Sequence, residues 1–245
     1  LGTALSYCDA ERENMKRILV CEDEDAIRDF VVINLVRSGY DVVDVSCGED
    51  AVKVYTEQNG NFDVALLDIM MPGMDGFALC RWIREQSSEI GIIMLSAKSQ
   101  EMDKVNCLMI GADDYVTKPF SPSELVARVD AIYRRVNVSQ SRQESVRNIT
   151  SGSFTLDYQS RTVLKNGEPV ELTQVEYHIM EFLLKNRGTA LDRKTILHHI
   201  WGEAYYGDDK VVDVNIRRLR MKIEEDPSNP QYIQTIWGFG YKWNG

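Results

Sequence analysis

Short runs of apolar residues alternate with longer amphipathic stretches from Arg17 onward. Apolar runs of strand length between stretches of helix length predict βαβ units around a buried parallel sheet. Five such units make a doubly wound α/β domain of the flavodoxin-like class, which we expect over residues 16–136. The predicted strands are Ile18–Cys21, Val42–Val45, Val64–Leu67, Ile92–Leu95 and Tyr115–Thr117. The predicted helices are Asp25–Arg37, Gly48–Gln58, Gly76–Glu85, Gln100–Ile110 and Pro122–Val136.

The pattern changes after residue 148. Strand-like segments surround the pair Asn166-Gly167, which is a strong signal for a two-residue hairpin turn. Thr173 and Glu176 have the spacing of a capping box at the start of a helix. Strands, three helices and a terminal hairpin predict an α+β winged helix-turn-helix domain over residues 149–245. Its predicted strands are Phe154–Leu156, Arg161–Lys165, Val170–Leu172, Ile233–Trp237 and Tyr241–Trp243, and its predicted helices are Thr173–Lys185, Arg193–Ile200 and Val211–Glu224.

Two further segments lack a secondary-structure pattern. Residues 1–15 are polar, and we expect a disordered N-terminal extension there. Residues 137–148 are rich in Ser, Gln and Arg, which is typical of a linker. No apolar run approaches the roughly 20 residues of a membrane span. The five cysteines are widely spaced, without a Cys-x-x-Cys pair, and fit buried free thiols in a reducing cytoplasm.

The net charge of −10 is distributed unevenly along the chain. Residues 1–145 hold 15 Lys and Arg against 25 Asp and Glu, whereas residues 146–245 hold 13 of each. Such asymmetry supports two domains. Because the second half is neutral overall, it can bind DNA only where its cations are clustered.

Polar residues follow the predicted strands of the first domain. The first strand leads into Glu22 and Asp23, the third ends at Asp68, the fourth at Ser96 and the fifth at Lys118. Ligands of open parallel sheets bind beyond the carboxyl ends of the strands. Packed carboxylates repel one another unless a cation lies among them, and hard oxygen ligands favour Mg²⁺. A carboxylate can also accept a phosphoryl group as an aspartyl phosphate.

The first domain resembles CheY-like receiver domains over its whole length. The stretches that carry the resemblance are Ile18–Glu24, Leu67–Gly76, Met94–Ala97 and Gly111–Phe120. The resemblance implies that Asp68 accepts phosphate from a sensor histidine kinase. It also implies that Asp23, Asp68 and the Met70 carbonyl bind Mg²⁺ directly, while Glu22 contributes through water.

The same resemblance assigns the remaining residues of the acidic site. Ser96 would bond a phosphoryl oxygen, and Lys118 would pair with the phosphoryl group. Tyr115 would be the aromatic switch residue that turns inward when Ser96 moves. The Lys118–Pro119 peptide would be cis, a form that is essentially confined to X-Pro bonds. A phosphoryl group adds roughly −1.5 to −2 charge at neutral pH, which suits a switch.

One predicted helix combines an apolar stripe with a cationic side. Val212, Ile216, Leu219 and Ile223 fall on one face, while the cations lie away from it. The domain resembles the output domain of the OmpR/PhoB family over Leu172–Tyr177, Asp213–Arg220 and Thr235–Tyr241. The resemblance implies that this helix lies in the major groove of promoter DNA. Arg218 and Val214 would face base edges, and the phosphates would be held by Lys210, Asn215, Arg217 and Arg220.

The wing differs from part of that family. Some members carry Arg at the position of Trp237, where it can enter the minor groove. Trp offers no cation, so minor-groove contact is in doubt and packing of Trp237 within the domain is the alternative. The loop Gly202–Asp209 resembles the segment through which this family contacts RNA polymerase.

The resemblance also implies a homodimer that forms on phosphorylation. Lys104 with Glu124, and Asp114 with Arg128, match charged positions of the family's receiver dimer face. Exposed pairs contribute only about 0–1 kcal/mol each, so they set register more than affinity.

Two other functions remain open at the level of sequence. A phosphatase that works through an aspartyl phosphate typically has a second Asp two residues after the nucleophile, where this chain has Met70. A DNA-binding protein with a vestigial receiver is the other alternative. The full set of Asp68, Ser96 and Lys118 argues against it.

Overall fold

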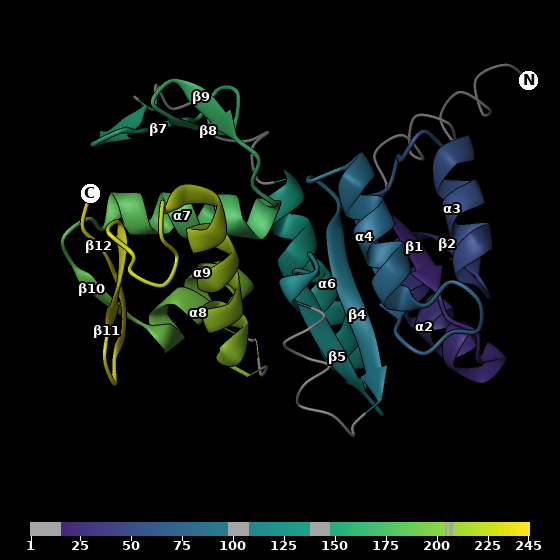
Figure 1. Cartoon of the computed structure of the whole chain (residues 1–245). Coiled ribbons are helices and arrows are strands. Elements are labelled where there is room, and N and C mark those ends of the chain that lie inside the picture. The colour runs from purple at the N-terminus through teal and green to yellow at the C-terminus, as the bar shows by residue number, and fades with distance from the viewer. Residues whose placement is uncertain (1–15, 98–107, 138–147, 204, 206–207) are drawn as a thin grey trace, which may run out of the picture. The chain divides into compact units, whose positions relative to one another are not determined.

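The computed structural model describes residues 16–97, 108–137, 148–203, 205 and 208–245. The chain divides into two compact units, one through Tyr133 and one from Arg134. The predicted extension (1–15), most of the linker (137–148) and most of the helix predicted over Gln100–Ile110 lie outside the described residues. Figure 1 shows the helices and strands of the two units.

Unit 1 is built on a five-stranded parallel sheet with the order β2-β1-β3-β4-β5. Its central strands are buried because helices flank the sheet (Figure 1). The doubly wound α/β class is therefore confirmed. The strands are β1 (Arg17–Cys21), β2 (Asp41–Val45), β3 (Val64–Asp68), β4 (Gly91–Ala97) and β5 (Asp114–Lys118).

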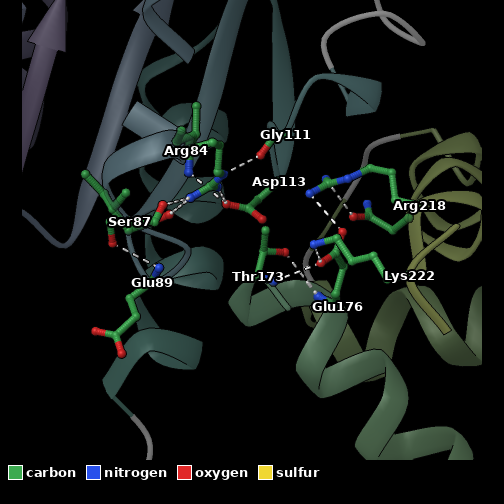
Figure 2. A network of polar contacts seen from close by, with 12 residues as sticks. Arg84, Ser87, Glu89, Gly111, Asp113, Thr173, Glu176, Arg218 and Lys222 are labelled. Carbon is green, nitrogen blue, oxygen red and sulfur yellow. Dashed lines mark hydrogen bonds and ion pairs between the residues drawn. The ribbon is translucent and has the colours of Figure 1, made fainter. Parts of the chain in front are cut away.

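The helices of unit 1 begin and end close to the predicted positions. They are α2 (Asp25–Arg37), α3 (Gly48–Glu57), α4 (Gly76–Gln86) and α6 (Pro122–Asn137). α3 and α4 contact each other. The guanidinium of Arg84 in α4 donates to the carbonyls of Ile90 and Gly111 and to the Asp113 carboxylate, which ties α4 to the segments that enter β4 and β5 (Figure 2).

The described residues from 148 onward form two antiparallel sheets and three helices, as expected for a winged helix. One sheet has the order β6-β7-β8-β9, and its Asn166-Gly167 turn has positive φ at both residues, as the favoured two-residue hairpin requires. The other has the order β10-β12-β11. The strands are β6 (Ile149–Ser151), β7 (Phe154–Asp157), β8 (Thr162–Lys165), β9 (Glu168–Val170), β10 (Ala190–Asp192), β11 (Ile233–Ile236) and β12 (Gly240–Trp243). The helices are α7 (Gln174–Lys185), α8 (Arg193–Trp201) and α9 (Lys210–Ile223).

β6 and β10 were not predicted. Each has only three residues, which is too short for an alternating pattern, and each forms because a distant strand pairs with it. β10 pairs with β12, and Gly240 in β12 allows the close approach, because a Cβ there would lie 2.0 Å from the Leu191 carbonyl oxygen.

A buried carboxylate joins α7 to α9. Thr173 and Glu176 form the predicted capping box, and Glu176 is fully buried. Its two oxygens lie 2.9 Å from the Arg218 guanidinium and 2.6 Å from the Lys222 ammonium (Figure 2). Burial alone would raise the pKa of Glu176, but the two cations outweigh burial and lower it. The ion pairs thus hold the third helix against the first.

We expect Glu176→Gln to destabilise unit 2 by about 3 kcal/mol, because the substitution leaves the buried Arg218 without its counter-charge. Urea unfolding of the full chain by tryptophan emission would measure the change, since Trp201, Trp237 and Trp243 lie in unit 2. Glu225→Gln, at an exposed position just beyond α9, is the matched control. Equal stability of the two variants would contradict the structural role of Glu176.

A second carboxylate of α7 predicts acid sensitivity. Burial would raise the pKa of Glu181, but hydrogen bonds with His178 and Lys185 outweigh it and lower the pKa to about 2. A depressed pKa stabilises the fold above the unfolded value near 4.5, and this stability is lost as the pH falls toward 2.

Wild type should therefore exceed Glu181→Gln in unfolding free energy by about 2 kcal/mol at about pH 6 and by much less near about pH 2.5. The same urea titration at several pH values would measure both differences. A difference in unfolding free energy that does not change with pH would contradict the lowered pKa of Glu181.

Candidate functional site

Three carboxylates meet at the carboxyl edge of the parallel sheet. Glu22 follows β1 directly, Asp23 is next to it, and Asp68 is the last residue of β3. One oxygen from each lies within 4.8 Å of the others. Glu22 is fully buried and Asp68 is 4% exposed. β1 and β3 are neighbours in the sheet, and their parallel register places these residues at one edge.

Lys118 provides the cation of this site from the end of β5. Its Nζ lies 2.7 Å from Glu22 Oε2 and 2.9 Å from Asp68 Oδ1. Burial raises the pKa of Glu22, although Lys118 opposes the shift. Burial would lower the pKa of Lys118, but Asp68 and Glu22 outweigh it and raise the pKa. The ammonium is therefore charged at neutral pH and held by two carboxylates.

The donor set fits a divalent cation. Three carboxylates lie together and Lys118 contacts two of them, so their ionised forms carry more negative charge than this one ammonium balances. Carboxylate oxygens are the ligands that Mg²⁺ prefers, and one or two of them commonly hold it together with water and phosphate. Met70, whose carbonyl was predicted as a further ligand, lies two residues after Asp68 with its side chain 74% exposed.

Ser96 lies on the strand next to Asp68. Asp68 is aligned with Leu95 in the pairing of β3 with β4, so Ser96 is one residue farther along toward the same edge. It is 2% exposed, and its hydroxyl donates to the Ala97 carbonyl. Tyr115 in β5 is aligned with Met94 and is 6% exposed. The Lys118–Pro119 peptide is cis, as the family resemblance implied.

Two residues that the sequence analysis did not single out shape the loop after Asp68. A Cβ on Gly76 would lie 2.1 Å from the Asp68 carbonyl oxygen, so only glycine allows α4 to begin there. Glu49 in α3 accepts a hydrogen bond from the Met74 backbone N–H at 2.9 Å. The sequence signal for the first was the Asp75-Gly76 pair, since Asp75 is the N-cap of α4.

The six residues predicted to bind DNA lie on α9 but differ in their surroundings. Lys210 and Arg217 are exposed. Arg220 donates to the Ile233 carbonyl and the Thr235 hydroxyl of β11, and the Asn215 amide donates to the Val211 carbonyl. Arg218 pairs with Glu176, and Val214 is 7% exposed. Several predicted contact residues thus also hold the domain together.

Of the charges predicted for a dimer face, Lys104 lies outside the described residues. Arg128 bonds both of the other two within the chain, and Asp114 and Arg128 are buried, so their pair is not the exposed one that was expected. The Arg128 guanidinium lies 3.0 Å from Asp114 and 2.9 Å from Glu124.

The described cysteines and histidines fit the ordinary roles expected of them. Burial raises the pKa of the Cys21 thiol to about 12, which keeps it protonated and unreactive. His178 bonds Glu181, and His199 stacks on Phe182. Among the residues that the structure describes, no helix is long and apolar enough to span a membrane.

Comparisons with known proteins agree with the architecture. Residues 18–130 match the family model of the response regulator receiver domain, and residues 167–243 match that of the transcriptional regulatory protein C-terminal domain. The crystal structure of response regulator DrrB, a Thermotoga maritima OmpR/PhoB homologue, is 34% identical, with 94% of this chain and 100% of that chain covered and a TM-score of 0.48. A RitR mutant is 27% identical, with 93% and 98% covered and a TM-score of 0.72.

The two family models match different parts of the chain, which together span most of it. The expected fold and domain types are therefore confirmed together. The chain belongs to the OmpR/PhoB family of two-component response regulators, which act as DNA-binding transcription factors.

Proposed function

We propose that this response regulator accepts a phosphoryl group on Asp68 from a sensor histidine kinase, dimerises through its receiver domain and binds promoter DNA to control transcription in the cytoplasm. The observation that carries the proposal is the contact of the Lys118 ammonium with both Glu22 and Asp68, beside Ser96 on the next strand. The site holds a nucleophilic carboxylate, a cation and a hydroxyl together. A Met70 at the position of a phosphatase's second Asp favours a switch over an enzyme with an external substrate.

The chemical step is a phosphoryl transfer. An oxygen of the Asp68 carboxylate attacks phosphorus, the bond from phosphorus to the kinase histidine nitrogen breaks, and that nitrogen keeps the electron pair and takes a proton. The product is an acyl phosphate on Asp68. Mg²⁺, held by Asp23, Asp68 and the Met70 carbonyl with Glu22 acting through water, would neutralise phosphoryl charge. The same site would allow the receiver to catalyse its own dephosphorylation by water.

Lys118 and Ser96 convert the added charge into a signal. The Lys118 ammonium leaves Glu22 and pairs with one phosphoryl oxygen. The Ser96 hydroxyl leaves the Ala97 carbonyl and donates to a second phosphoryl oxygen. One cation about 4 Å from a phosphoryl charge contributes about 4 kcal/mol of attraction at an effective dielectric constant of about 20. Moving a two-state equilibrium from 1:99 to 99:1 requires about 5.5 kcal/mol, so these contacts together are of the right size. Tyr115 then follows Ser96 as the switch residue.

The receiver would dimerise by exchanging ion pairs. Within the chain Arg128 bonds Asp114 and Glu124. On dimerisation these contacts would be replaced by ion pairs across a two-fold interface, where Lys104 would pair with Glu124. Two DNA-binding domains would then lie near adjacent half-sites. The loop Gly202–Asp209, of which residues 204, 206 and 207 lie outside the described residues, would contact RNA polymerase.

On DNA, α9 would lie in the major groove. Support is strongest for Lys210 and Arg217, whose exposed cations can hold phosphates. Arg220 and Asn215 also bond within the domain, and they would add further phosphate contacts. Arg218, which bonds Glu176 and Asn215 within the domain, would face a base edge beside Val214.

Acetyl phosphate with Mg²⁺ should add a phosphoryl mass to the wild type and to Asp50→Asn, an exposed carboxylate on α3, but not to Asp68→Asn, because Asp68 is the proposed acceptor and Asp50 lies outside the acidic site. Intact-protein mass spectrometry would measure the gain. Light scattering after size exclusion should give a dimer only for the two modified proteins. A gain in Asp68→Asn, or none in any protein, would contradict the proposed phosphoacceptor.

Replacing Arg217 should reduce the dependence of DNA binding on salt. Each phosphate contact contributes about −0.9 to the slope of log K against log salt concentration, so Arg217→Ala should flatten that slope by about 0.9. Fluorescence anisotropy on a duplex selected from a random library by the wild type would measure it. Arg187→Ala, an exposed cation outside α9, should leave the slope unchanged. An unchanged slope in Arg217→Ala would remove this residue from the interface.

A further inference from the structure

Sulfur-bearing side chains gather beside the acidic site of unit 1. Cys21 is the last residue of β1 and is fully buried, and Met71 is 6% exposed. The Cys21 thiol donates to the Met71 thioether, with Sγ and Sδ 3.4 Å apart. A single thiol proton therefore lies between two sulfur atoms in the interior of the domain.

Cys47 brings a third sulfur to the same place. It is the N-cap of α3, a helix that contacts β1, and it follows Val45 by two residues. Val45 is aligned with Cys21 in the pairing of β1 with β2. Burial raises the pKa of Cys21 most, and among the neighbouring ionisable groups Cys47 raises this pKa more than Asp68 does. The strand register and the electrostatics thus agree that the two thiols are neighbours.

This set of ligands suits a soft metal ion. Thiolate and thioether sulfurs select Cu(I), whereas carboxylates suit hard ions such as Mg²⁺. Structural Zn²⁺ sites usually take four thiolate or imidazole ligands, and the three histidines of the chain all lie in unit 2. The sulfur set therefore differs in ligand chemistry from the acidic site, although Cys21 directly precedes Glu22.

A monovalent cation would remove the obstacle that burial places on the Cys21 thiolate. Burial keeps this thiol protonated, because a thiolate there would carry an uncompensated charge away from water. Cu(I) that binds the thiolate replaces the thiol proton, which passes to water, so the charge at Cys21 is unchanged. The Cys47 proton also passes to water on binding, and partial exposure of Cys47 lets solvent stabilise the second thiolate and gives the ion an entry route.

We propose that Cys21, Cys47 and Met71 form a soft-metal site that binds one Cu(I) ion through two thiolates and one thioether. The Met71 side chain is unbranched and polarizable, so it can adjust to the ion without a change in the backbone. Because none of the three side chains belongs to the acidic site, binding of copper requires neither Mg²⁺ nor phosphorylation of Asp68.

Cu(I) binding to the full chain tests this proposal, measured without oxygen by competition with the chromophoric chelator bicinchoninate. Cys21→Ala and Cys47→Ala should each bind at least about 100-fold more weakly than wild type, since even residues that only support a metal ligand contribute about 10–100-fold. Met71→Leu, which keeps the side-chain volume, should lose about 10-fold, the lower end of this range. Cys80→Ala removes a buried free thiol of α4 outside the cluster and should bind as tightly as wild type.

Thermal unfolding separates loss of the site from loss of the fold. Cu(I) should raise the unfolding temperature of wild type and Cys80→Ala, but not that of Cys21→Ala or Cys47→Ala, because a ligand that binds the folded state stabilises it. Cys47 is only partly buried, so Cys47→Ala decides the outcome even if Cys21→Ala does not fold.

X-ray absorption at the copper edge gives an independent readout and should show only sulfur neighbours in the wild type. Nitrogen or oxygen neighbours at the copper would overturn the inference. Wild-type affinity in either folded cysteine variant would also overturn it, because the copper would then be held elsewhere in the chain.

Discussion

Removing a carboxylate from water costs several kcal/mol unless cations or hydrogen-bond donors replace the water, and each unit of this protein contains a carboxylate that meets this constraint. In unit 1 Glu22 and Asp68 are buried beside Lys118. In unit 2 Glu176 is buried between Arg218 and Lys222. Both arrangements depend on side chains that the fold brings together from distant segments.

The two sites differ in charge balance, and this difference separates the site proposed to react from the one that holds the fold together. Glu176 faces two cations and the backbone N–H of its capping box, so its negative charge is fully compensated within the domain. Glu22 and Asp68 share the Lys118 ammonium, and Asp23 adds a third carboxylate to the site. Under the proposed function, the excess negative charge would attract a divalent ion, and added phosphoryl charge would draw the ammonium away from its present partners.

In unit 2 two of the cations proposed to contact DNA also stabilise the domain. Arg218 and Arg220 lie on the helix proposed to enter the major groove, and they bond Glu176 and the backbone of β11. Asp213 joins α9 to Arg193 and Tyr241, and through Tyr241 to the β11–β12 hairpin. Helix and wing are therefore positioned by a small set of ion pairs, and rigid positioning of this kind lowers the entropic cost of binding.

The sequence by itself determined the order of the predicted strands and helices, the positions of Glu22, Asp23, Asp68, Ser96 and Lys118 at the ends of their strands, and the Asn166-Gly167 turn. These features are local, because the periodicity of two or 3.6 residues and the polar residues after each strand can be read without knowing what packs against them. Only the tertiary structure decided the strands β6 and β10, the pairing of Glu176 with Arg218 and Lys222, and the exposure of Trp237, which is 91% exposed, so the alternative that it packs within the domain is wrong. Each of these depends on which residues, tens of positions apart, meet in the folded chain, and a short stretch of sequence carries no record of its distant partner.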